Sequence, residues 1–254
     1  MINAVGYALK NMCANPGRAG HSLSQFCSVN LYRAREEINS FFNGSGAETV
    51  IFCKNCTEAL NTVIKGVTGK YDEIIISDLE HNAVLRPVVK TGLFYKTFSV
   101  SPESDEETIE NFKNALTDKT KLAVVTAASN VTGRILPVEK IGKICKEKGI
   151  LFCVDAAQGG GVIPIDIKKM NIDFLCIAGH KGLYAPMGTG VLIANKEIKN
   201  TLTEGGNGMD SLKETQEPVF PEGFESGTVS LPNIMGLKAG TEFVRKKNRE
   251  SIYK

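Results

Sequence analysis

Residues 151–158 read LFCVDAAQ, a short apolar run that ends in Asp155 and a polar turn. Residues 174–182, FLCIAGHKG, have the same layout and end near His180 and Lys181. Continuous apolar runs of about four to eight residues, bounded by turn signals, are typical of strands buried on both faces of a parallel sheet. Polar side chains directly after such strands lie at the carboxyl edge of the sheet, where α/β folds bind their ligands.

Short apolar and β-branched runs alternate with helical patterns along the rest of the chain. Strands that alternate with helices indicate a parallel sheet covered by helices on both faces. We therefore predict a three-layer α/β/α fold with a mostly parallel, roughly seven-stranded sheet. The predicted strands span residues 49–53, 73–77, 94–100, 122–126, 151–155, 174–178 and 190–194. The predicted helices span residues 31–42, 57–67, 82–90, 106–116 and 138–148.

The last predicted helix begins near Pro232 and still runs at Lys254 without a stop signal. We expect residues 1–232 to form one large domain and residues 233–254 to begin a helix that leads to a C-terminal small domain outside this sequence. The alternative is a natural terminus that frays, as many chain ends do. Residues 203–228 are rich in glycine and lack periodicity, which predicts a long functional loop.

The composition excludes several classes of function. Of the 254 residues, 42% are hydrophobic and 23% charged, and the net charge is only +2, so we expect no nucleic-acid surface and no polybasic membrane surface. No apolar run approaches the roughly 20 residues of a membrane span, and residues 1–13 form a mixed amphipathic stretch without a signal-peptide layout. The seven cysteines favour reduced thiols in a cytoplasm. His, Cys and carboxylate residues show no metal-ligand spacing.

Polar residues follow two of the earlier predicted strands. Cys56 and Thr57 open a helix, where free amides, a hydroxyl and the helix dipole favour a phosphate group. The alternative there is a plain helix cap, which any helix needs. His81 enters the next helix, where an imidazole could stack on a flat ligand or transfer protons. Its alternative is a surface or capping histidine.

Three later strand ends add further chemistry. Asn130 lies in a turn with Gly133, which also has the simpler interpretation of an Asn-Gly turn. Asp155 is costly to bury unless it meets a cation, such as a protonated pyridine nitrogen, or caps a helix. Lys181 is interpreted as a desolvated amine that attacks a carbonyl, against the alternative of an exposed loop lysine. Together these groups match the needs of pyridoxal 5'-phosphate (PLP).

The segment from Asp155 to Gln158, followed by the Gly179-His180-Lys181 motif, resembles the class V aminotransferase group. Within that group the cysteine desulfurase and selenocysteine lyase branch is the most similar. The similarity covers nearly the whole chain in the order of the family. Further matches lie at residues 15–21, 57–59, 80–83, 129–133 and 224–228.

The resemblance implies a role for each matching residue. Lys181 would hold PLP as a Schiff base and move the substrate α-proton, while His81 would stack on the ring and assist proton transfer. Asp155 would pair with the pyridinium nitrogen, and Gln158 would hydrogen-bond the phenolic oxygen. Further contacts would come from Thr57 and His180 to the phosphate and from Asn130 to the substrate carboxylate. Thr228 would reach the phosphate of another subunit, which implies a homodimer with shared sites.

The sequence departs from this family at several points. Ala178 stands where the family usually carries Ser or Thr, and the lost contact to the phosphate would cost about 1.5–3 kcal/mol of binding. The resemblance leads us to expect that the family's first motif lies before this sequence, and that the small domain with its nucleophilic cysteine and carboxylate-binding arginine lies after it. None of the seven cysteines occupies the place of that nucleophile.

The resemblance implies a PLP-dependent cysteine desulfurase-like protein, represented by its cofactor-binding core. L-Cysteine would yield L-alanine, and the sulfur would pass to a persulfide and then to a possible acceptor protein. Selenocysteine lyase chemistry, aminotransferase chemistry and a non-catalytic PLP-binding fragment are the alternatives. A different class of alternative is a thiol–disulfide redox site at Cys53 and Cys56, whose C-x-x-C spacing lies at a strand-to-helix junction.

Overall fold

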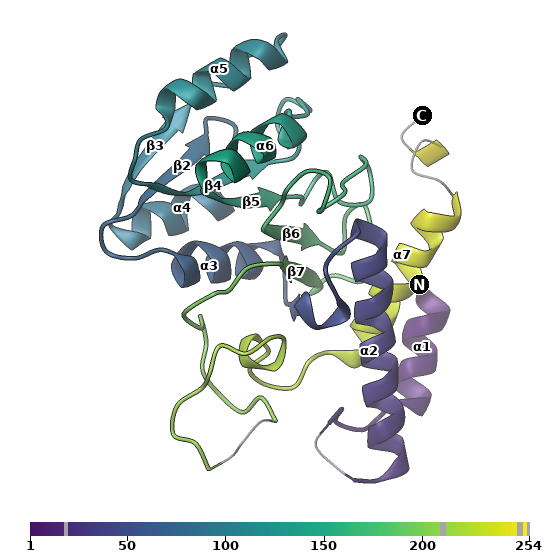
Figure 1. Ribbon diagram of the computed structural model, residues 1–254. Coiled ribbons are helices and arrows are strands. Elements are labelled where there is room, and N and C mark those ends of the chain that lie inside the picture. The colour runs from purple at the N-terminus through teal and green to yellow at the C-terminus, as the bar shows by residue number, and fades with distance from the viewer. Residues whose placement is uncertain (18–19, 209–211, 248–250, 253–254) are drawn as a thin grey trace.

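The computed structural model describes residues 1–17, 20–208, 212–247 and 251–252. Its centre is a seven-stranded sheet with the order β1-β7-β6-β5-β4-β2-β3 (Figure 1). The predicted three-layer α/β/α architecture and the predicted strand positions are confirmed. The strands are β1 (Val50–Cys53), β2 (Glu73–Ser77), β3 (Phe94–Phe98), β4 (Thr120–Thr126), β5 (Leu151–Asp155), β6 (Phe174–Ala178) and β7 (Gly190–Ala194).

The sheet is parallel except at β7, which is antiparallel to both β1 and β6. The carboxyl ends of the remaining strands therefore meet at one edge. The register brings Thr126 of β4 beside Asp155 of β5, and Asp155 beside Cys176 of β6. The strand ends that carry the predicted chemistry thus lie next to one another.

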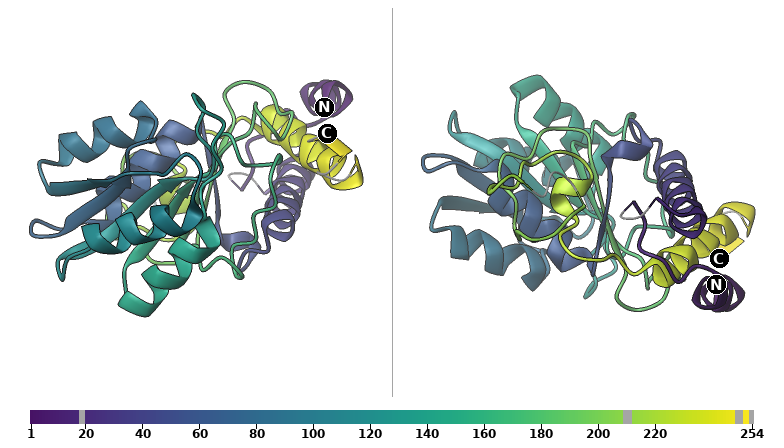
Figure 2. Two further views of the ribbon diagram at one scale, coloured as in Figure 1. Left: turned by 90° about the horizontal axis from the view of Figure 1, so that it is seen from above. Right: turned by 90° about the horizontal axis from the view of Figure 1, so that it is seen from below.

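Helices cover both faces of the sheet and one of its sides. Figure 2 shows α3 and α4 on one face and α5 and α6 on the other, while α1, α2 and α7 group together beside the β1 and β7 side of the sheet. Two short 3₁₀ turns lie at Ala47–Thr49 and Glu222–Phe224. The helices are α1 (Ile2–Asn11), α2 (Ser22–Phe42), α3 (Cys56–Val67), α4 (Asn82–Thr91), α5 (Asp105–Ala115), α6 (Val138–Lys148) and α7 (Leu231–Lys247).

The amino-terminal helices differ most from the prediction. The second helix begins at Ser22 rather than near residue 31, because the imidazole Nδ1 of His21 accepts the amide of Ser24 and caps it there. Histidine is not among the usual helix-capping residues, so this start carries no strong signal. The stretch 1–13, interpreted only as amphipathic, contains α1.

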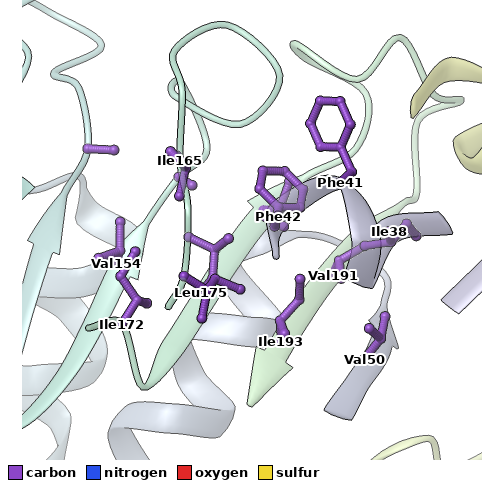
Figure 3. Packing of buried hydrophobic residues seen from close by; sticks show 14 of the residues in the cluster. Ile38, Phe41, Phe42, Val50, Val154, Ile165, Ile172, Leu175, Val191 and Ile193 are labelled. Carbon is purple, nitrogen blue, oxygen red and sulfur yellow. The ribbon is translucent and has the colours of Figure 1, made fainter. Parts of the chain in front are cut away.

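The alternation of side chains along the central strands builds two apolar layers. In β6, Leu175 and Ile177 join one buried cluster, while Phe174 and Cys176 point to the opposite face and join the other. Figure 3 shows how α2 closes the first cluster, because Ile38 and Phe42 reach toward residues of β1 and β7. Burial on both faces explains why these strands read as continuous apolar runs.

Residues 203–228 form the predicted long loop, with the turn at Glu222–Phe224 as its regular part in the described residues. Residues 209–211 of this loop and residues 18–19 of the matching segment 15–21 lie outside the described residues. The last helix, α7, begins at Leu231 and packs against α1 and α2. The division of the chain at residue 232 stays a prediction.

Candidate functional site

One cavity of about 170 Å³ opens at the carboxyl edge of the sheet. It brings together every site residue predicted from sequence except Thr228. The reason is topological, because β1, β2, β4, β5 and β6 each end at this edge and each is followed by one of the polar segments. The lining residues are Asn55, Cys56, Thr57, Leu60, His81, Ala83, Thr126, Ala128, Asn130, Asp155, Ala157, Gln158, Ala178, His180 and Lys181.

The first turn of α3 presents donors to the cavity. Asn55 caps the helix, and its side-chain oxygen accepts the amide of Glu58 at 2.9 Å. The amides of Cys56 and Thr57 belong to the first turn, where a helix provides no acceptor of its own. Thr57 is exposed and adds a hydroxyl. The cap is supplied by Asn55, which leaves the amides of Cys56 and Thr57 without a capping partner, and the anion site there stays a prediction.

Asp155 is a buried acid at the base of the cavity, with 2% of its surface exposed. Its Oδ1 accepts the amide of Ala157 at 2.8 Å and the thiol of Cys56 at 3.4 Å. Burial raises the pKa of this carboxyl, and these hydrogen bonds together with the charges of Lys181 and His81 oppose the rise. Oδ2 has no hydrogen-bond partner among the described residues, so the acid is suited to a cationic partner that enters the cavity.

His81 caps a helix and also lines the cavity, while its role toward a ligand stays a prediction. It caps α4, since its Nδ1 accepts the amide of Ala83 at 3.0 Å. In the neutral imidazole the ring proton then lies on Nε2. The ring is exposed and lines the cavity, so a capping histidine is also available to a ligand there.

Lys181 differs from the sequence interpretation. Its side chain is exposed, so the expected desolvation of the amine is wrong for this structure. The lysine lies beyond the buried end of β6, in a turn where the amide of Tyr184 donates to its carbonyl at 3.0 Å. A Cβ on Gly182 would approach the carbonyl of Gly160 to 2.3 Å, which explains the glycine beside the lysine. The amine is therefore held at the cavity rim on a closely packed turn.

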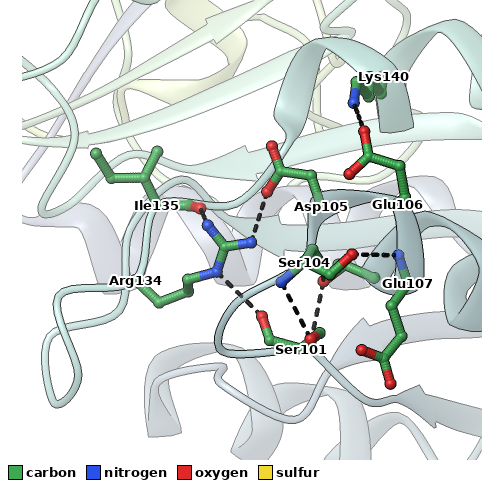
Figure 4. Close-up of polar contacts among 9 residues, drawn as sticks. Ser101, Ser104, Asp105, Glu106, Glu107, Arg134, Ile135 and Lys140 are labelled. Carbon is green, nitrogen blue, oxygen red and sulfur yellow. Dashed lines mark hydrogen bonds and ion pairs between the residues drawn. The ribbon is translucent and has the colours of Figure 1, made fainter.

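The Asn130 turn is held from outside by Arg134, which the sequence analysis did not single out. Figure 4 shows the guanidinium of Arg134 donating to the carbonyl of Ser101 at 3.1 Å and to the carboxylate of Asp105 at 2.5 Å. Inside the turn the hydroxyl of Ser129 accepts the amides of Val131 and Thr132, both at 3.3 Å. Asn130 is exposed at the cavity on this braced turn.

Thr228 lies outside the Lys181 cavity. It is exposed and lines a separate hollow of about 610 Å³ with Asn15, Tyr32 and Val229. The loop before it is anchored by a buried ion pair between Arg35 and Glu225 at 2.7 Å. This placement leaves Thr228 available to a neighbouring molecule rather than to the site of its own chain.

The two cysteines of the C-x-x-C motif are free thiols. Burial raises the pKa of both, well above the usual range, so neither has the thiolate character that a redox site needs. The thiol of Cys56 contacts Asp155, not Cys53. The geometry therefore argues against the thiol–disulfide interpretation.

A second acid near the cavity, the half-buried Glu80, was not predicted as a functional residue. Its Oε2 is buried without a hydrogen-bond partner among the described residues. The available signal was its position between the end of β2 and His81.

The chemistry of the cavity fits PLP. An acid with an open oxygen, an amine and a helix start with free amides are the groups that its pyridine ring, aldehyde and phosphate require. Ala178 contributes only a methyl group where a hydroxyl would assist. A larger apolar groove of about 780 Å³, lined by Ile135, Pro137 and Ile163 among others, offers no comparable set of groups.

The described part of the chain offers neither a metal site nor a membrane-spanning helix. No group of three His, Cys, Asp or Glu side chains there is arranged to hold a metal ion. No helix within the described ranges combines the length and apolar character that crossing a membrane requires.

Comparisons with known proteins find one family model and several proteins named cysteine desulfurase. The family model described as Aminotransferase class-V matches residues 1–254. The cysteine desulfurase IscS of Ehrlichia chaffeensis is 39% identical over 233 residues, covering 88% of this chain and 54% of that protein. A probable cysteine desulfurase of Pyrococcus abyssi is 34% identical over 255 residues, covering 95% of this chain and 62% of that protein.

The solved apo structure of a cysteine desulfurase from Thermococcus onnurineus NA1 matches with a TM-score of 0.87 and 30% identity. The match covers 98% of this chain and 64% of that one. The chain thus spans 54% to 64% of the length of these three relatives.

Proposed function

The chain belongs to the aminotransferase class-V family, and from this we propose that it carries the PLP site of a cysteine desulfurase. The observation that supports the proposal is the convergence of Lys181, His81 and Asp155 on one cavity, with an oxygen of the buried Asp155 left open. Similarity to proteins named cysteine desulfurase favours this branch over selenocysteine lyase or aminotransferase chemistry.

The proposed roles follow from the chemistry of each side chain. PLP supplies, when bound, an aldehyde that condenses with amines and a ring that withdraws electrons. Lys181 attaches the cofactor through its Nζ and later moves the proton of the substrate α-carbon. Asp155 stabilises positive charge on the ring nitrogen, and the Nε2 proton of His81 is available for transfer.

The remaining contacts orient the cofactor and the substrate. Thr57, the amide of Cys56 and His180 hold the phosphate at the start of α3. Gln158 donates to the phenolic oxygen, and Asn130 contacts the substrate carboxylate from its braced turn. Each of these residues lines the same cavity.

In the proposed reaction the C–S bond of L-cysteine breaks and the sulfur forms an S–S bond with an acceptor thiol. The acceptor becomes a persulfide, and the carbon that loses sulfur gains a proton, which yields L-alanine. Cys56, the cysteine that lines the cavity, is a poor acceptor, since burial raises its pKa. We propose that the sulfur passes to a thiolate from outside this cavity and then to an acceptor protein.

We further propose a homodimer in a cytoplasm, in which Thr228 reaches the cofactor phosphate of the second subunit. The exposure of Thr228 and its separation from the Lys181 cavity of its own chain support this arrangement. Reduced thiols among the cysteines of the described residues are consistent with that compartment.

The test adds PLP to the purified chain and follows the visible absorption of the lysine-bound cofactor, followed by borohydride trapping. The wild type is expected to form the trapped species, and Lys181→Ala is expected to lose it. Lys119→Ala is the matched control, because Lys119 precedes β4 at the opposite edge of the sheet and should keep the band.

L-Cysteine and L-selenocysteine are then offered in parallel, and alanine formation is measured with a thiol acceptor present. Alanine from cysteine supports desulfurase activity, and alanine from selenocysteine alone would favour the lyase. A trapped cofactor without either product would identify a PLP-binding chain without turnover. The absence of any band in the wild type would contradict the proposal.

A further inference from the structure

Glu80 connects two strand ends next to the cavity, since it bonds the amide of the lining residue Thr126. It follows β2, and its Oε1 accepts the hydroxyl of Ser77 at 2.5 Å and the amide of Thr126 at 2.8 Å. Ser77 is the last residue of β2 and Thr126 the last residue of β4, so one carboxyl oxygen joins the carboxyl ends of two neighbouring strands.

The same connection reaches the proposed cofactor residues. His81 is the next residue in the chain, and its ring is already fixed on one side by the bond from the amide of Ala83 to Nδ1. Thr126 lines the cavity and is the register partner of Asp155. The carboxyl of Glu80 is thus the short link between the segment that carries His81 and the strands that carry Asp155.

The surroundings of the second carboxyl oxygen of Glu80 bear on the protonation state of this side chain. Oε2 is buried and has no partner within the described ranges. Burial raises the pKa of Glu80 to about 8, the charge of Asp155 adds to the rise, and the bonds from Ser77 and Thr126 oppose it. The raised pKa favours the neutral form of this acid at neutral pH, and Oε1 accepts both bonds.

We propose that Glu80 is a positioning residue, which joins the ends of β2 and β4 and thereby holds His81 at a fixed place beside Asp155. This inference rests on the proposed function, because His81 and Asp155 are the residues expected to contact the cofactor. It assigns Glu80 no direct contact with PLP. Its effect on the cofactor is transmitted through the two residues that it aligns.

Glu73 provides a matched control at the other end of β2. It is buried, with 4% of its surface exposed, and its Oε1 accepts the hydroxyls of Thr117 and Thr120 at 2.9 and 3.0 Å. It resembles Glu80 in residue type and in accepting two bonds through Oε1, but lies at the edge of the sheet away from the cavity. Comparing Glu80→Ala with Glu73→Ala separates positioning from general stability.

The first readout needs no cofactor. The chain has three histidines, so the ring signals of His81 can be assigned by substitution and followed by NMR in the cofactor-free protein. Glu80→Ala is expected to shift the His81 ring signals, and Glu73→Ala to leave them in place. Ser77→Ala, which removes one of the two donors, is expected to shift them less, and it serves if Glu80→Ala does not fold.

The second readout is PLP affinity from absorbance titration. Glu80→Ala is expected to bind PLP about tenfold more weakly, which corresponds to losing one well-placed hydrogen-bonding group. Glu80→Gln keeps an oxygen in the position of Oε1 and is expected to stay within about twofold of wild type at pH 7. Glu73→Ala is expected to bind within about twofold as well.

The third readout is pH dependence. As the pH rises through about 8, ionisation of Glu80 places a further negative charge near Asp155 and His81. The charge of Lys181 also acts on Asp155. The His81 signals of the wild type should move in this range, and those of Glu80→Gln should not.

Two outcomes would overturn the inference. One is a Glu80→Ala protein whose His81 signals and PLP affinity match those of Glu73→Ala. The other is a Glu80→Gln protein as impaired as Glu80→Ala, which would mean that the charge and not the alignment matters. If the wild type binds no PLP, the proposed function fails, but the His81 signals of the cofactor-free protein still decide whether Glu80 positions that ring.

Discussion

Two buried carboxyl groups in this protein have opposite surroundings. Glu225 in the long loop has all its contacts supplied by the protein: its Oε1 accepts from Arg35 at 2.8 Å and from the amide of Phe52 at 2.6 Å, and its Oε2 accepts from Arg35 at 2.7 Å. Asp155 in the cavity has two donors on Oδ1 and none on Oδ2 among the described residues. The first acid has a cation of its own, and the second lacks one in direct contact.

This difference in surroundings suits Glu225 to anchoring the fold and Asp155 to binding a ligand. A buried carboxylate with a bidentate arginine has its charge and its hydrogen-bonding capacity satisfied by the protein. Through this pair, Arg35 and Glu225 join α2, β1 and the loop that carries Thr228. A buried carboxylate with an open oxygen lowers the stability of the chain unless a ligand completes it. Groups that weaken the fold in this way are expected at functional sites. Asp155 is therefore the acid to test for binding, and Glu225 the acid to test for stability.

The largest effect on folding stability is expected from Arg35→Ala. The substitution leaves Glu225 as an uncompensated buried charge and removes the bond from Arg35 to the carbonyl of Val50, so it should lower the free energy of unfolding by about 3–5 kcal/mol. Urea unfolding of the cofactor-free protein measures this loss. Arg33→Ala is the control, because Arg33 is exposed on the same helix. Equal losses in both variants would remove the distinction between a complete buried pair and an ordinary surface charge.

Asp155→Asn should preserve the folding stability of the cofactor-free chain and weaken PLP binding, whereas Arg35→Ala should mainly lower folding stability. Burial raises the pKa of Asp155, so the folded chain loses stability as the pH rises from the unfolded value of about 3.9 through the folded value, and asparagine removes that loss. The cofactor-free variant should therefore be at least as stable as wild type at pH 7.5 in urea unfolding. Its PLP affinity should fall roughly 10- to 100-fold, since a charged contact to the ring nitrogen is lost. A variant that is destabilised but binds PLP normally would show that Asp155 is an anchor like Glu225.

The smallest effect on folding stability is expected from Lys140→Ala. Lys140 and Glu106 form an ion pair at 2.7 Å between α6 and α5, and both side chains are more than half exposed (Figure 4). Solvent and salt screen such a pair, so the melting temperature should change by less than about 1 °C. A thermal melt at low and high salt measures it. A shift approaching that of Arg35→Ala would mean that burial is not what distinguishes the Arg35–Glu225 pair.

Much of the site could be predicted because its residues are local to strand ends. Asp155, His81, Asn130 and Lys181 each follow an apolar strand, and parallel strands bring such ends to one edge. Arg134 and Glu80 could not be assigned in this way. Their partners are distant in the chain, and a sequence read without the fold does not indicate that Glu80 will meet Thr126 or that Arg134 will meet Ser101.

From about residue 31 onward, the sequence alone determined the order of strands and helices, their approximate bounds and the edge at which the chemistry gathers, because these depend on periodicity and turn residues over short stretches. Only the tertiary structure decided which side chains are buried and with whom. It placed Lys181 in solvent beyond a buried strand and paired Arg35 with a glutamate 190 residues away. Burial and ion pairing depend on all the elements packed around a side chain, and that information is not contained in any one segment.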